Sequence, residues 1–365
     1  MMIVSKQHQI FFDFLRFSIG PKSEIPSSLK EADWKALYRI AKKQCLVGIL
    51  FNGIQRLPSS DVGISRELLL QWMAQSQMLE KANVRLNDAV IQVSEWFRKK
   101  GFRTCILKGQ GNALLYPNGL HRTPGDIDIW VEGGDKRVIS FVRSISPHEK
   151  ACYHHIVFPS YKGVEVEVHY RPSFLLCFWH NRKLQKYYEK VKEVQFLHRV
   201  KLGEQGEVAI PTAEFNLIFQ LTHIFTHLMN EGIGLRQLVD YYFVLSMLRV
   251  NCEMLTSLQK KLKELGLWKF AGAIMYIMQE VFGMPASRLI VPPNEKYGRF
   301  VLNEVLEAGN FGRHDARNRF GRSQLGHNLQ RVYRDMRLMR YFPGEALCEP
   351  LFRIWHFFWR MKNKK

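Results

Sequence analysis

The sequence predicts an α+β protein in which a small mixed β-sheet lies between a helical N-terminal segment and a helical C-terminal domain. Three observations support this prediction. Residues 1–100 carry apolar side chains at helical spacing, residues 101–211 contain runs that alternate polar and apolar side chains, and residues 212–365 return to helical spacing. A chain of 365 residues is also long enough for more than one domain.

The N-terminal segment is expected to be helical. The run FFDFLRF at 11–17 looks like one apolar helix face that docks on the body of the protein. It does not look like a secretory signal, because the segment lacks a basic start and a small-residue cleavage site. Ser28 with Glu31 fits a capping box at the start of the next helix. A longer helix should cover residues 65–100, and Gly101 is suited to end it.

The middle of the chain changes to strand-like patterns. Residues 104–107 form a short apolar run that suits a buried strand. The string DIDIWV at 126–131 alternates acidic and apolar side chains, as a strand with two different faces does. A helix is expected over residues 136–144. Four more strands are expected over residues 154–158, 164–170, 193–200 and 207–211.

From residue 212 onward the helical pattern continues nearly to the end. Pro211 and Thr212 form a start signal for an amphipathic helix, EFNLIFQLTHIFTHLMN. The Pro-Pro pair at 292–293 breaks the pattern, and an arginine-rich segment follows it. Further helices are expected over residues 235–248, 253–265 and 267–282.

Composition and charge favour some partners and sites for this protein and argue against others. The net charge of +20 favours polyanionic partners such as nucleotide phosphates, nucleic acid or an anionic membrane surface, or it simply keeps the protein soluble. No apolar run reaches the roughly 18 to 20 residues needed to cross a bilayer. The six cysteines include no CxxC pair, which argues against a zinc ribbon, a redox motif and a disulfide scaffold. Most are expected to be buried thiols, and the protein is expected in the cytoplasm.

The acidic residues of two predicted strands point to a metal site. Asp126 and Asp128 lie two apart on a strand, so both carboxylates project from the same face. Like charges that close repel each other unless a cation lies between them, and carboxylate oxygens suit Mg²⁺ or Mn²⁺. The strand VEVEVHY offers Glu167 as a third ligand, with Glu165 as a competitor. Three carboxylates can hold two ions, as in phosphoryl transfer.

A turn just upstream suits a phosphate group. LKGQG links a strand to a helix, where the backbone N–H groups of Gly109 and Gln110 and the charge of Lys108 are available. Arg122 is expected to bind a phosphate with both ends of its guanidinium. The turn is neither a GxxxxGK[ST] loop nor a dinucleotide-binding fingerprint, because Leu114 stands at the third glycine position of the latter.

These residues resemble a known family. The string LKGQGNALLYPNGLHRTPGDIDIWV resembles the signature of the bacterial uncharacterised nucleotidyltransferase family, a branch of the DNA polymerase beta-like superfamily. The EVH of VEVEVHY looks like its third acidic strand. The stretch THIFTHLMNEGIGLRQLVDYY resembles its helical half, where two histidines precede an Arg and an Asp. The similarity covers about residues 30 to 280. The chain departs from better-known members of the superfamily, which carry Gly-Ser where Gly109 and Gln110 stand.

The resemblance implies a small nucleotidyltransferase sheet that binds a nucleoside triphosphate through two Mg²⁺ or Mn²⁺ ions. Asp126, Asp128 and Glu167 would be the metal ligands and catalytic residues, and the turn from Lys108 to Gln110 would bind phosphate. The expected reaction moves a nucleoside monophosphate to an acceptor hydroxyl. The acceptor stays open among RNA, a sugar, a small molecule and a protein. The alternative is a non-catalytic nucleotide- or RNA-binding protein that retains the fold.

Several further residues have two interpretations each. His169, His223 and His227 are expected either to face the cleft or to be hydrogen-bonded interior histidines. A zinc site at the last two is disfavoured, because the helix lacks the HExxH glutamate. Arg236 and Asp240 lie one turn apart and are expected to pair. The arginine-rich residues 313–340 suit nucleic acid or a solvated basic helix face. The C-terminal LFRIWHFFWRMKNKK is expected to dock on the body, with a membrane surface as the alternative.

Overall fold

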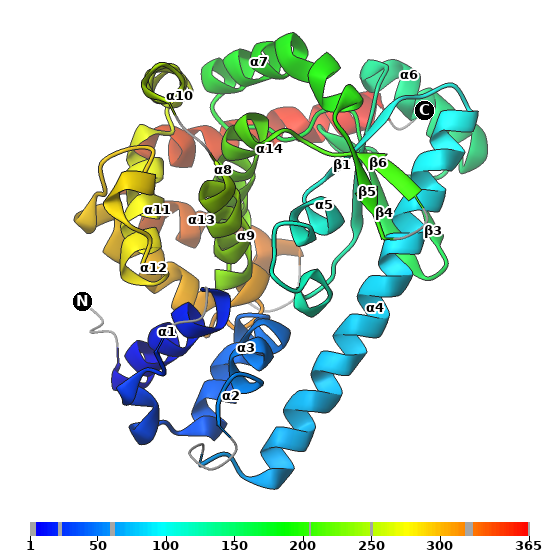
Figure 1. Cartoon of the computed structure of the whole chain (residues 1–365). Coiled ribbons are helices and arrows are strands. Elements are labelled where there is room, and N and C mark those ends of the chain that lie inside the picture. Colours follow the sequence, from blue (N-terminus) through cyan, green and yellow to red (C-terminus); the bar gives the residue numbers. More distant parts are fainter. Residues whose placement is uncertain are drawn as a thin grey trace.

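The computed structural model of the chain describes residues 5–20, 24–58, 63–203, 206–248, 251–317 and 324–363. The predicted α+β class is confirmed. A four-stranded mixed sheet lies among helices, with the N-terminal helices below it and the C-terminal helices along one side (Figure 1). A separate two-stranded hairpin accompanies this sheet.

The N-terminal segment folds into helices α1 to α4, as the spacing predicts. The apolar face at residues 11–17 is buried, which confirms that it docks on the body of the protein. The predicted capping box is wrong. Residues 27–31 form a short 3-10 helix, and Asp33 caps the next helix by accepting a hydrogen bond from the Ala36 N–H at 3.0 Å. The bounds are α1 Lys6–Ile19, α2 Trp34–Lys43, α3 Val47–Ile54 and α4 Arg66–Lys99.

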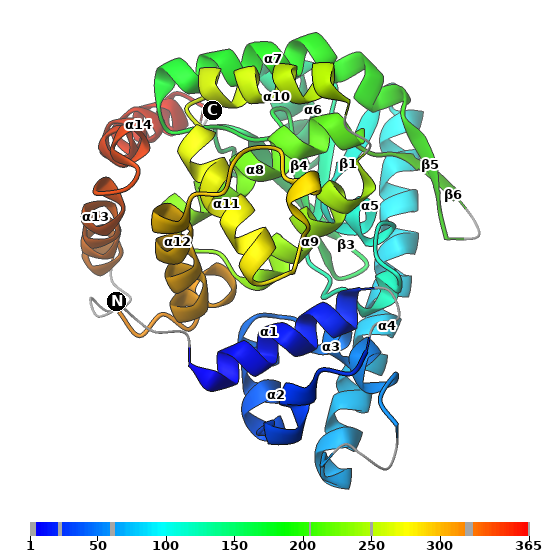
Figure 2. The same cartoon turned by 60° about the vertical axis from the view of Figure 1, so that its left-hand side comes forward.

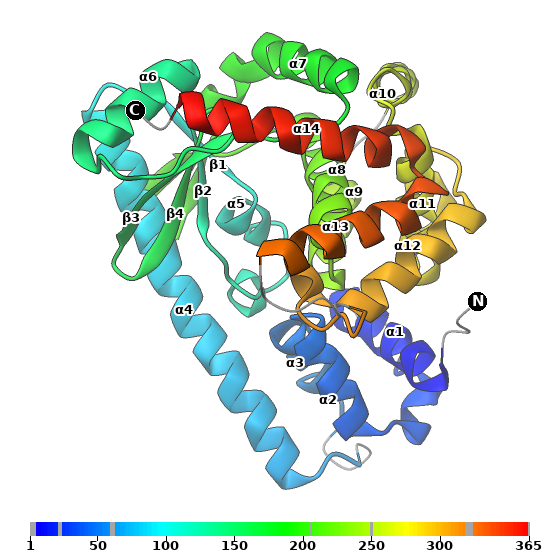
Figure 3. The same ribbon diagram turned by 180° about the vertical axis from the view of Figure 1, so that it is seen from behind.

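Helix α4 connects the N-terminal helices to the sheet. It begins where predicted, because the Ser65 side chain caps it by accepting from the Leu68 N–H at 3.3 Å. It ends just before Gly101, whose φ of +80° suits glycine. The early part of α4 packs on α3, and the later part runs along the sheet (Figures 1 and 3).

The central sheet has the strand order β1-β2-β4-β3. β2 runs antiparallel to β1 and parallel to β4, and β3 is antiparallel to β4. The helix predicted between β2 and β3 is confirmed as α6, Gly134–Ile145. The strand bounds are β1 Thr104–Leu107, β2 Ile127–Val131, β3 His155–Tyr161 and β4 Val164–His169.

The two faces of the sheet pack against different partners. Ile127, Ile129, Val166 and Val168 belong to one apolar core together with α4 and α6, as the strand alternation predicts. Trp130 on the other face joins the core that contains the C-terminal helices. Because side chains alternate along a strand, Asp128, Glu167 and His169 share that second face. The acidic residues of the strands therefore face the C-terminal helices.

The hairpin after the sheet differs partly from the prediction. β5 (Arg199–Leu202) and β6 (Gly206–Ala209) pair antiparallel and project from the edge of the molecule (Figure 2). Residues 193–197, predicted as strand, instead end helix α7, Phe178–Leu197. The side chains that α7 buries include Leu184, Tyr188 and Gln195, which lie four and seven apart on one helix face.

The C-terminal domain is helical. The predicted helices are confirmed as α8 to α11, and α8 begins after Thr212, whose side chain accepts from the Phe215 N–H at 3.4 Å. The helices α12 to α14 extend the domain beyond the Pro-Pro break. Their bounds are α8 Ala213–Asn230, α9 Leu235–Met247, α10 Cys252–Glu264, α11 Trp268–Glu280, α12 Glu295–Ala308, α13 Gln324–Met339 and α14 Pro343–Lys362.

Part of the arginine-rich segment points inward. Neither a nucleic-acid-binding surface nor a solvated basic helix face describes these residues. Arg317 donates hydrogen bonds to Glu304 at 2.7 Å and to Asp315 at 2.8 Å. Arg337 pairs with Glu304 at 3.1 Å, and Arg334 is buried. Arg317 thus ties the loop after α12 to that helix, and Arg337 ties α13 to α12.

The C-terminal helix α14 docks on the body, as predicted. Glu345 accepts hydrogen bonds from the N–H groups of Leu176 at 2.7 Å and Cys177 at 3.1 Å. The far end of α14 contacts Arg143 of α6 (Figure 3). The helix also leaves apolar side chains exposed, namely Leu347, Leu351, Ile354, Trp355, Phe357, Phe358 and Met361. No helix in the described ranges is long and apolar enough to span a membrane.

The cysteines are less buried than expected. All six are free thiols, but Cys105 and Cys177 are buried whereas Cys252 is exposed and the other three are half-buried. The expectation that most would be buried is therefore wrong.

Candidate active site

The register of β2 and β4 brings the acidic residues together. Asp128 lies directly opposite Glu167 in the parallel pair, so their side chains project side by side from the same face. Asp126 precedes β2 and is exposed, whereas Asp128 is only 4% exposed. Glu165 is exposed two residues before Glu167 and has no partner in this β2–β4 register. The pairing thus favours Glu167 as the third carboxylate.

Two cationic side chains contact Asp128. The Lys108 ammonium lies 3.0 Å from Oδ2, and Nε2 of His169 lies 2.9 Å from Oδ1. His169 also approaches Oε2 of Glu167, at 3.5 Å. Both oxygens of Asp128 are therefore already in contact with protein donors.

The pKa values of the carboxyl and imidazole groups in this cluster are shifted in different directions. Repulsion from Asp128, followed by burial, raises the pKa of Asp126 to about 6. Burial opposes ionisation of Asp128 too, but Lys108 and His169 outweigh it and hold the pKa of Asp128 below its usual range. Burial disfavours the charged form of His169, yet its hydrogen bonds to Asp128 and Glu167 raise its pKa to about 9. The cluster therefore holds two cations, Lys108 and His169, beside three carboxyl groups.

The donor set fits a divalent cation. Asp126 makes no side-chain hydrogen bond or ion pair within the described ranges, and its pKa is raised because the repulsion from Asp128 and burial outweigh the attraction of Lys108. Asp128 and Glu167 present carboxylate oxygens beside it. Hard oxygen ligands of this kind are those that Mg²⁺ and Mn²⁺ prefer.

The turn after β1 places Lys108 and Gly109 at the site but turns Gln110 away. Lys108 has a φ of +51° and Gly109 a φ of +45°, so the turn carries backbone strain next to the acidic strand. The Gln110 side chain is buried and donates to Asn87 of α4. Of the predicted turn residues, Gln110 can thus offer only its backbone. The helix that follows, α5 (Gly109–Ala113), is a single short turn.

Arg122 and Asp240 form a buried ion pair that the sequence did not reveal. Nε and one terminal nitrogen of Arg122 each donate to Asp240 at 2.8 Å, and the Tyr116 hydroxyl donates to the same carboxylate at 2.5 Å. Arg122 is only 3% exposed. Its guanidinium is therefore engaged within the protein, and the predicted pair of Arg236 with Asp240 is replaced by this longer-range one.

Arg236 is consequently left without a partner. Its side chain makes no hydrogen bond or ion pair within the described part of the chain, and its Nε is buried and unsatisfied. A methyl group built on Gly125 would lie 3.1 Å from the Arg236 guanidinium, which places that group against the loop before Asp126. Burial, together with the nearby charge of Arg122, lowers the pKa of Arg236. Such an unpaired cation next to the acidic residues suits an anionic ligand.

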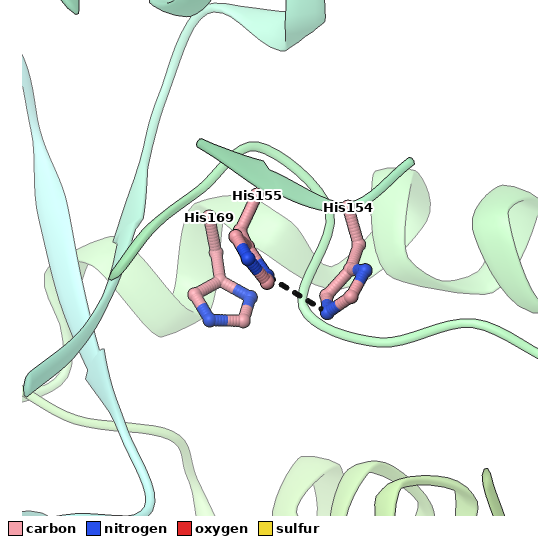
Figure 4. Close-up of side chains that lie close together, drawn as sticks. All are labelled: His154, His155 and His169. Atoms are coloured by element: carbon pink, nitrogen blue, oxygen red, sulfur yellow. Dashed lines mark hydrogen bonds between the residues drawn. The ribbon is translucent and has the colours of Figure 1, made fainter. Parts of the chain in front are cut away.

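Histidines line the other side of the site. Nε2 of His223 lies 2.7 Å from the Lys108 ammonium and 3.0 Å from Nε2 of His227, so these two residues face the cleft. His154 and His155, at the start of β3, lie beside His169 (Figure 4). His154 and His155 fall on a predicted strand for which the sequence indicates no role, because no motif of fixed spacing links an HH pair to a distant strand.

Two adjoining cavities share the acidic residues. The first has a volume of about 620 Å³ and is lined by Gly109, Glu165 and Arg236 among others. The second has a volume of about 570 Å³ and is rich in histidine. Both are lined by Lys108, Asp126, Asp128, His223, Phe311 and Arg313. Asp126 and Asp128 thus line both compartments, whereas Glu167 lines only the second, and two compartments that share reactive groups suit a two-substrate reaction.

The chain is similar in sequence to a known protein family. A family described as "Uncharacterised nucleotidyltransferase" matches residues 30–283 of the chain. Among solved structures, the chain is similar to an antigenic nucleotidyltransferase-like protein from Paracoccidioides brasiliensis, at 12% identity, over 59% of this chain and 96% of that chain, with a TM-score of 0.33. No curated protein matches it. The family match includes the acidic strands, the turn at Lys108 and the helices α8 and α9.

Proposed function

This chain belongs to the uncharacterised nucleotidyltransferase family, and we propose that it is an enzyme that moves a nucleoside monophosphate from a nucleoside triphosphate to an acceptor hydroxyl. The acceptor oxygen forms a bond to the α-phosphorus, the bond to the β-phosphate oxygen breaks, and pyrophosphate leaves. The observation that carries the proposal is the register of Asp128 opposite Glu167, with Asp126 at the mouth of both cavities.

The carboxylates are assigned to metal binding. Asp126, Asp128 and Glu167 would hold two Mg²⁺ or Mn²⁺ ions, which supply positive charge to the phosphoryl group and to the attacking and leaving oxygens. Burial raises the pKa of Glu167, but hydrogen bonding to His169 and the charge of His155 lower it overall, so Glu167 is ionised at neutral pH. Glu167, or a water beside it, is the group that would accept the proton of the acceptor hydroxyl.

The triphosphate is assigned to the first cavity. Lys108 lines it, and Arg236 supplies a guanidinium with no internal partner within the described part of the chain. Preorganised cations of this kind stabilise charge that develops on the phosphates. Arg236 takes the role that the sequence suggested for Arg122, because the Arg122 guanidinium is bound to Asp240. The second cavity is then left for the acceptor.

Nucleotide binding is the first property to measure. Thermal unfolding is recorded with each of the four common nucleoside triphosphates, with and without Mg²⁺ or Mn²⁺. We expect a rise in Tm only when nucleotide and ion are both present. Asp126→Ala/Asp128→Ala should abolish the rise and Arg236→Ala should reduce it, whereas the control Arg98→Ala, at an exposed surface pair, should retain it. The absence of any shift at millimolar nucleotide would contradict the proposal.

A non-catalytic binder is a second candidate, and one observation favours it. Lys108 and His169 already neutralise Asp128 in the absence of an ion, so the fold does not need one for charge balance there. A binder would keep its nucleotide-induced Tm rise in Asp126→Ala/Asp128→Ala and would release no pyrophosphate. The enzyme should release pyrophosphate when the matching nucleotide and a pool of acceptors are supplied.

A further inference from the structure

The pairing of β3 with β4 gathers imidazole groups beside Glu167. His155 lies directly opposite His169 in this antiparallel pair, so both rings project from the same face as Glu167. His154 precedes β3, and its carbonyl accepts from the N–H groups of Tyr170 at 3.0 Å and Arg171 at 3.2 Å, which fixes the segment against the end of β4. The three rings lie together next to the sheet (Figure 4).

From this arrangement we infer a nitrogen-rich metal site, formed by His154, His155 and His169 with Glu167 beside it, that binds Zn²⁺ or a similar transition-metal ion. It is separate from the carboxylate-only ion position assigned to Asp126. The inference goes beyond nucleotidyl transfer, because it concerns a bound metal that a catalytic protein and a non-catalytic binder of this fold would both carry.

The spacing of the ligand atoms fits a single ion. Nδ1 of His155 lies 3.0 Å from Nε2 of His154 and 3.4 Å from Oε2 of Glu167, which in turn lies 3.5 Å from Nε2 of His169. A tetrahedral zinc ion with bonds of about 2.1 Å needs ligand atoms about 3.4 Å apart. The three imidazole nitrogens also lie within 4.8 Å of one another. The three imidazoles are thus close enough to converge on one ion, and Glu167 lies beside them.

The contacts of His169 decide which of its nitrogens can bind the ion. Nδ1 lies 3.4 Å from the Arg171 carbonyl, and Nε2 lies 2.9 Å from Oδ1 of Asp128. A carbonyl next to the second ring nitrogen is the usual support for a metal-bound imidazole, so Nε2 is the ligand atom and gives up its hydrogen bond to Asp128 when the ion binds. The ligand nitrogens must be deprotonated, so binding of the ion releases protons.

The surrounding charges leave room for a cation. Lys108 contacts Oδ2 of Asp128, the oxygen opposite to the one that His169 contacts, so the ammonium lies on the far side of that carboxylate. Both imidazole contacts of Glu167 use Oε2, which leaves Oε1 for the ion of the carboxylate site. Imidazole donors select zinc-like ions over Mg²⁺, which prefers oxygen.

The test uses the full-length protein stripped of metal with a chelator and then titrated with Co²⁺ in the presence of millimolar Mg²⁺. Co²⁺ in a tetrahedral nitrogen-rich site absorbs strongly in the visible range. We expect one equivalent to bind with that absorption and to be displaced by Zn²⁺. The variant His154→Ala/His155→Ala should weaken binding at least tenfold (an order of magnitude typical for lost ligand support). The exposed His148→Ala serves as the matched control.

Two outcomes would overturn the inference: Co²⁺ binding that Mg²⁺ displaces, or an affinity unchanged in His154→Ala/His155→Ala. If thermal unfolding shows that this double variant does not fold, the milder His155→Asn answers the same question. Asp126→Ala separates this site from the proposed function. It should lose nucleotide-dependent stabilisation and keep the Co²⁺ absorption, so either hypothesis can fail alone.

Discussion

Arg122 and Asp240 join the loop before the acidic strand to helix α9 through two parallel hydrogen bonds of 2.8 Å, and both side chains are buried. The pair connects the sheet and the helical domain, which together enclose the first cavity. It positions the site without offering a free guanidinium to a ligand.

Removing one member of this pair should destabilise the fold strongly. Asp240→Ala leaves the buried Arg122 charge and the Tyr116 hydroxyl without their acceptor, which should cost about 3 to 5 kcal/mol of unfolding free energy. The measurement is chemical denaturation. The control Glu95→Ala removes an exposed partner of Arg98 and should change little. A loss at Asp240 no greater than that at Glu95 would show that the pair contributes nothing to stability.

Gly48 should tolerate no larger residue. A Cβ at this position in α3 would lie 2.3 Å from the His121 carbonyl oxygen, so the loop that leads to Arg122 would have to move. Gly48→Ala should therefore destabilise by about 1 to 3 kcal/mol. Gly344→Ala in α14, where a Cβ meets nothing within 4 Å, is the matched control and should be neutral or slightly stabilising. Equal effects in thermal unfolding would refute the steric argument.

Stability should fall as the pH rises through neutrality because of Asp335. Burial and the adjacent Glu349 raise the pKa of Asp335 to about 7. A carboxyl group whose pKa is raised on folding stabilises the protein below its unfolded pKa of about 3.9, and that contribution is lost as the pH climbs through the folded pKa. Asp335→Asn should flatten the decline in Tm between about pH 4 and pH 7. Asp88→Asn, at an exposed site of α4, should leave it unchanged. A decline of the same size in both variants would assign it to other groups.

Lys108→Gln should separate ion binding from nucleotide binding. Without the ammonium beside Asp128, the carboxylates lose a counter-charge, so Mg²⁺ alone should raise the Tm more than it does in the natural protein. The loss of a cation from the first cavity should meanwhile weaken nucleotide binding about tenfold or more. Isothermal titration measures both, with the exposed Lys136→Gln as control. If both affinities fell together, Lys108 would instead support the ion site structurally.

The local patterns of the sequence predicted the strands and the acidic face well. Alternation in DIDIWV and VEVEVHY fixes which side chains share a face, and the buried Ile127, Ile129, Val166 and Val168 follow from it. Local spacing failed for Asp240, because its partner lies 118 residues away rather than one helical turn away. The pattern of residues 193–197 predicted a strand, but these residues are helical because α7 packs its buried face against the rest of the protein.

The histidine cluster lay beyond the reach of sequence reasoning for a related reason. That His155 opposes His169 depends on the β3–β4 register, and that His154 turns to the same side depends on the bend before β3. Neither is encoded in a motif of fixed spacing. The free guanidinium of Arg236 became evident only once Arg122 was seen to occupy Asp240.

Helix α4 has a consequence for any attempt to shorten this protein. Its later residues supply Leu86, Ala89, Val90, Val93 and Phe97 to the core beneath the sheet. A truncated chain that starts at residue 101, where the strand patterns begin, would expose that apolar layer to water and should aggregate. Since the same helix also packs on α3, its own first half would lose cover if α1 to α3 were deleted. The smallest soluble fragment that retains the acidic strands therefore has to keep the N-terminal helices with them.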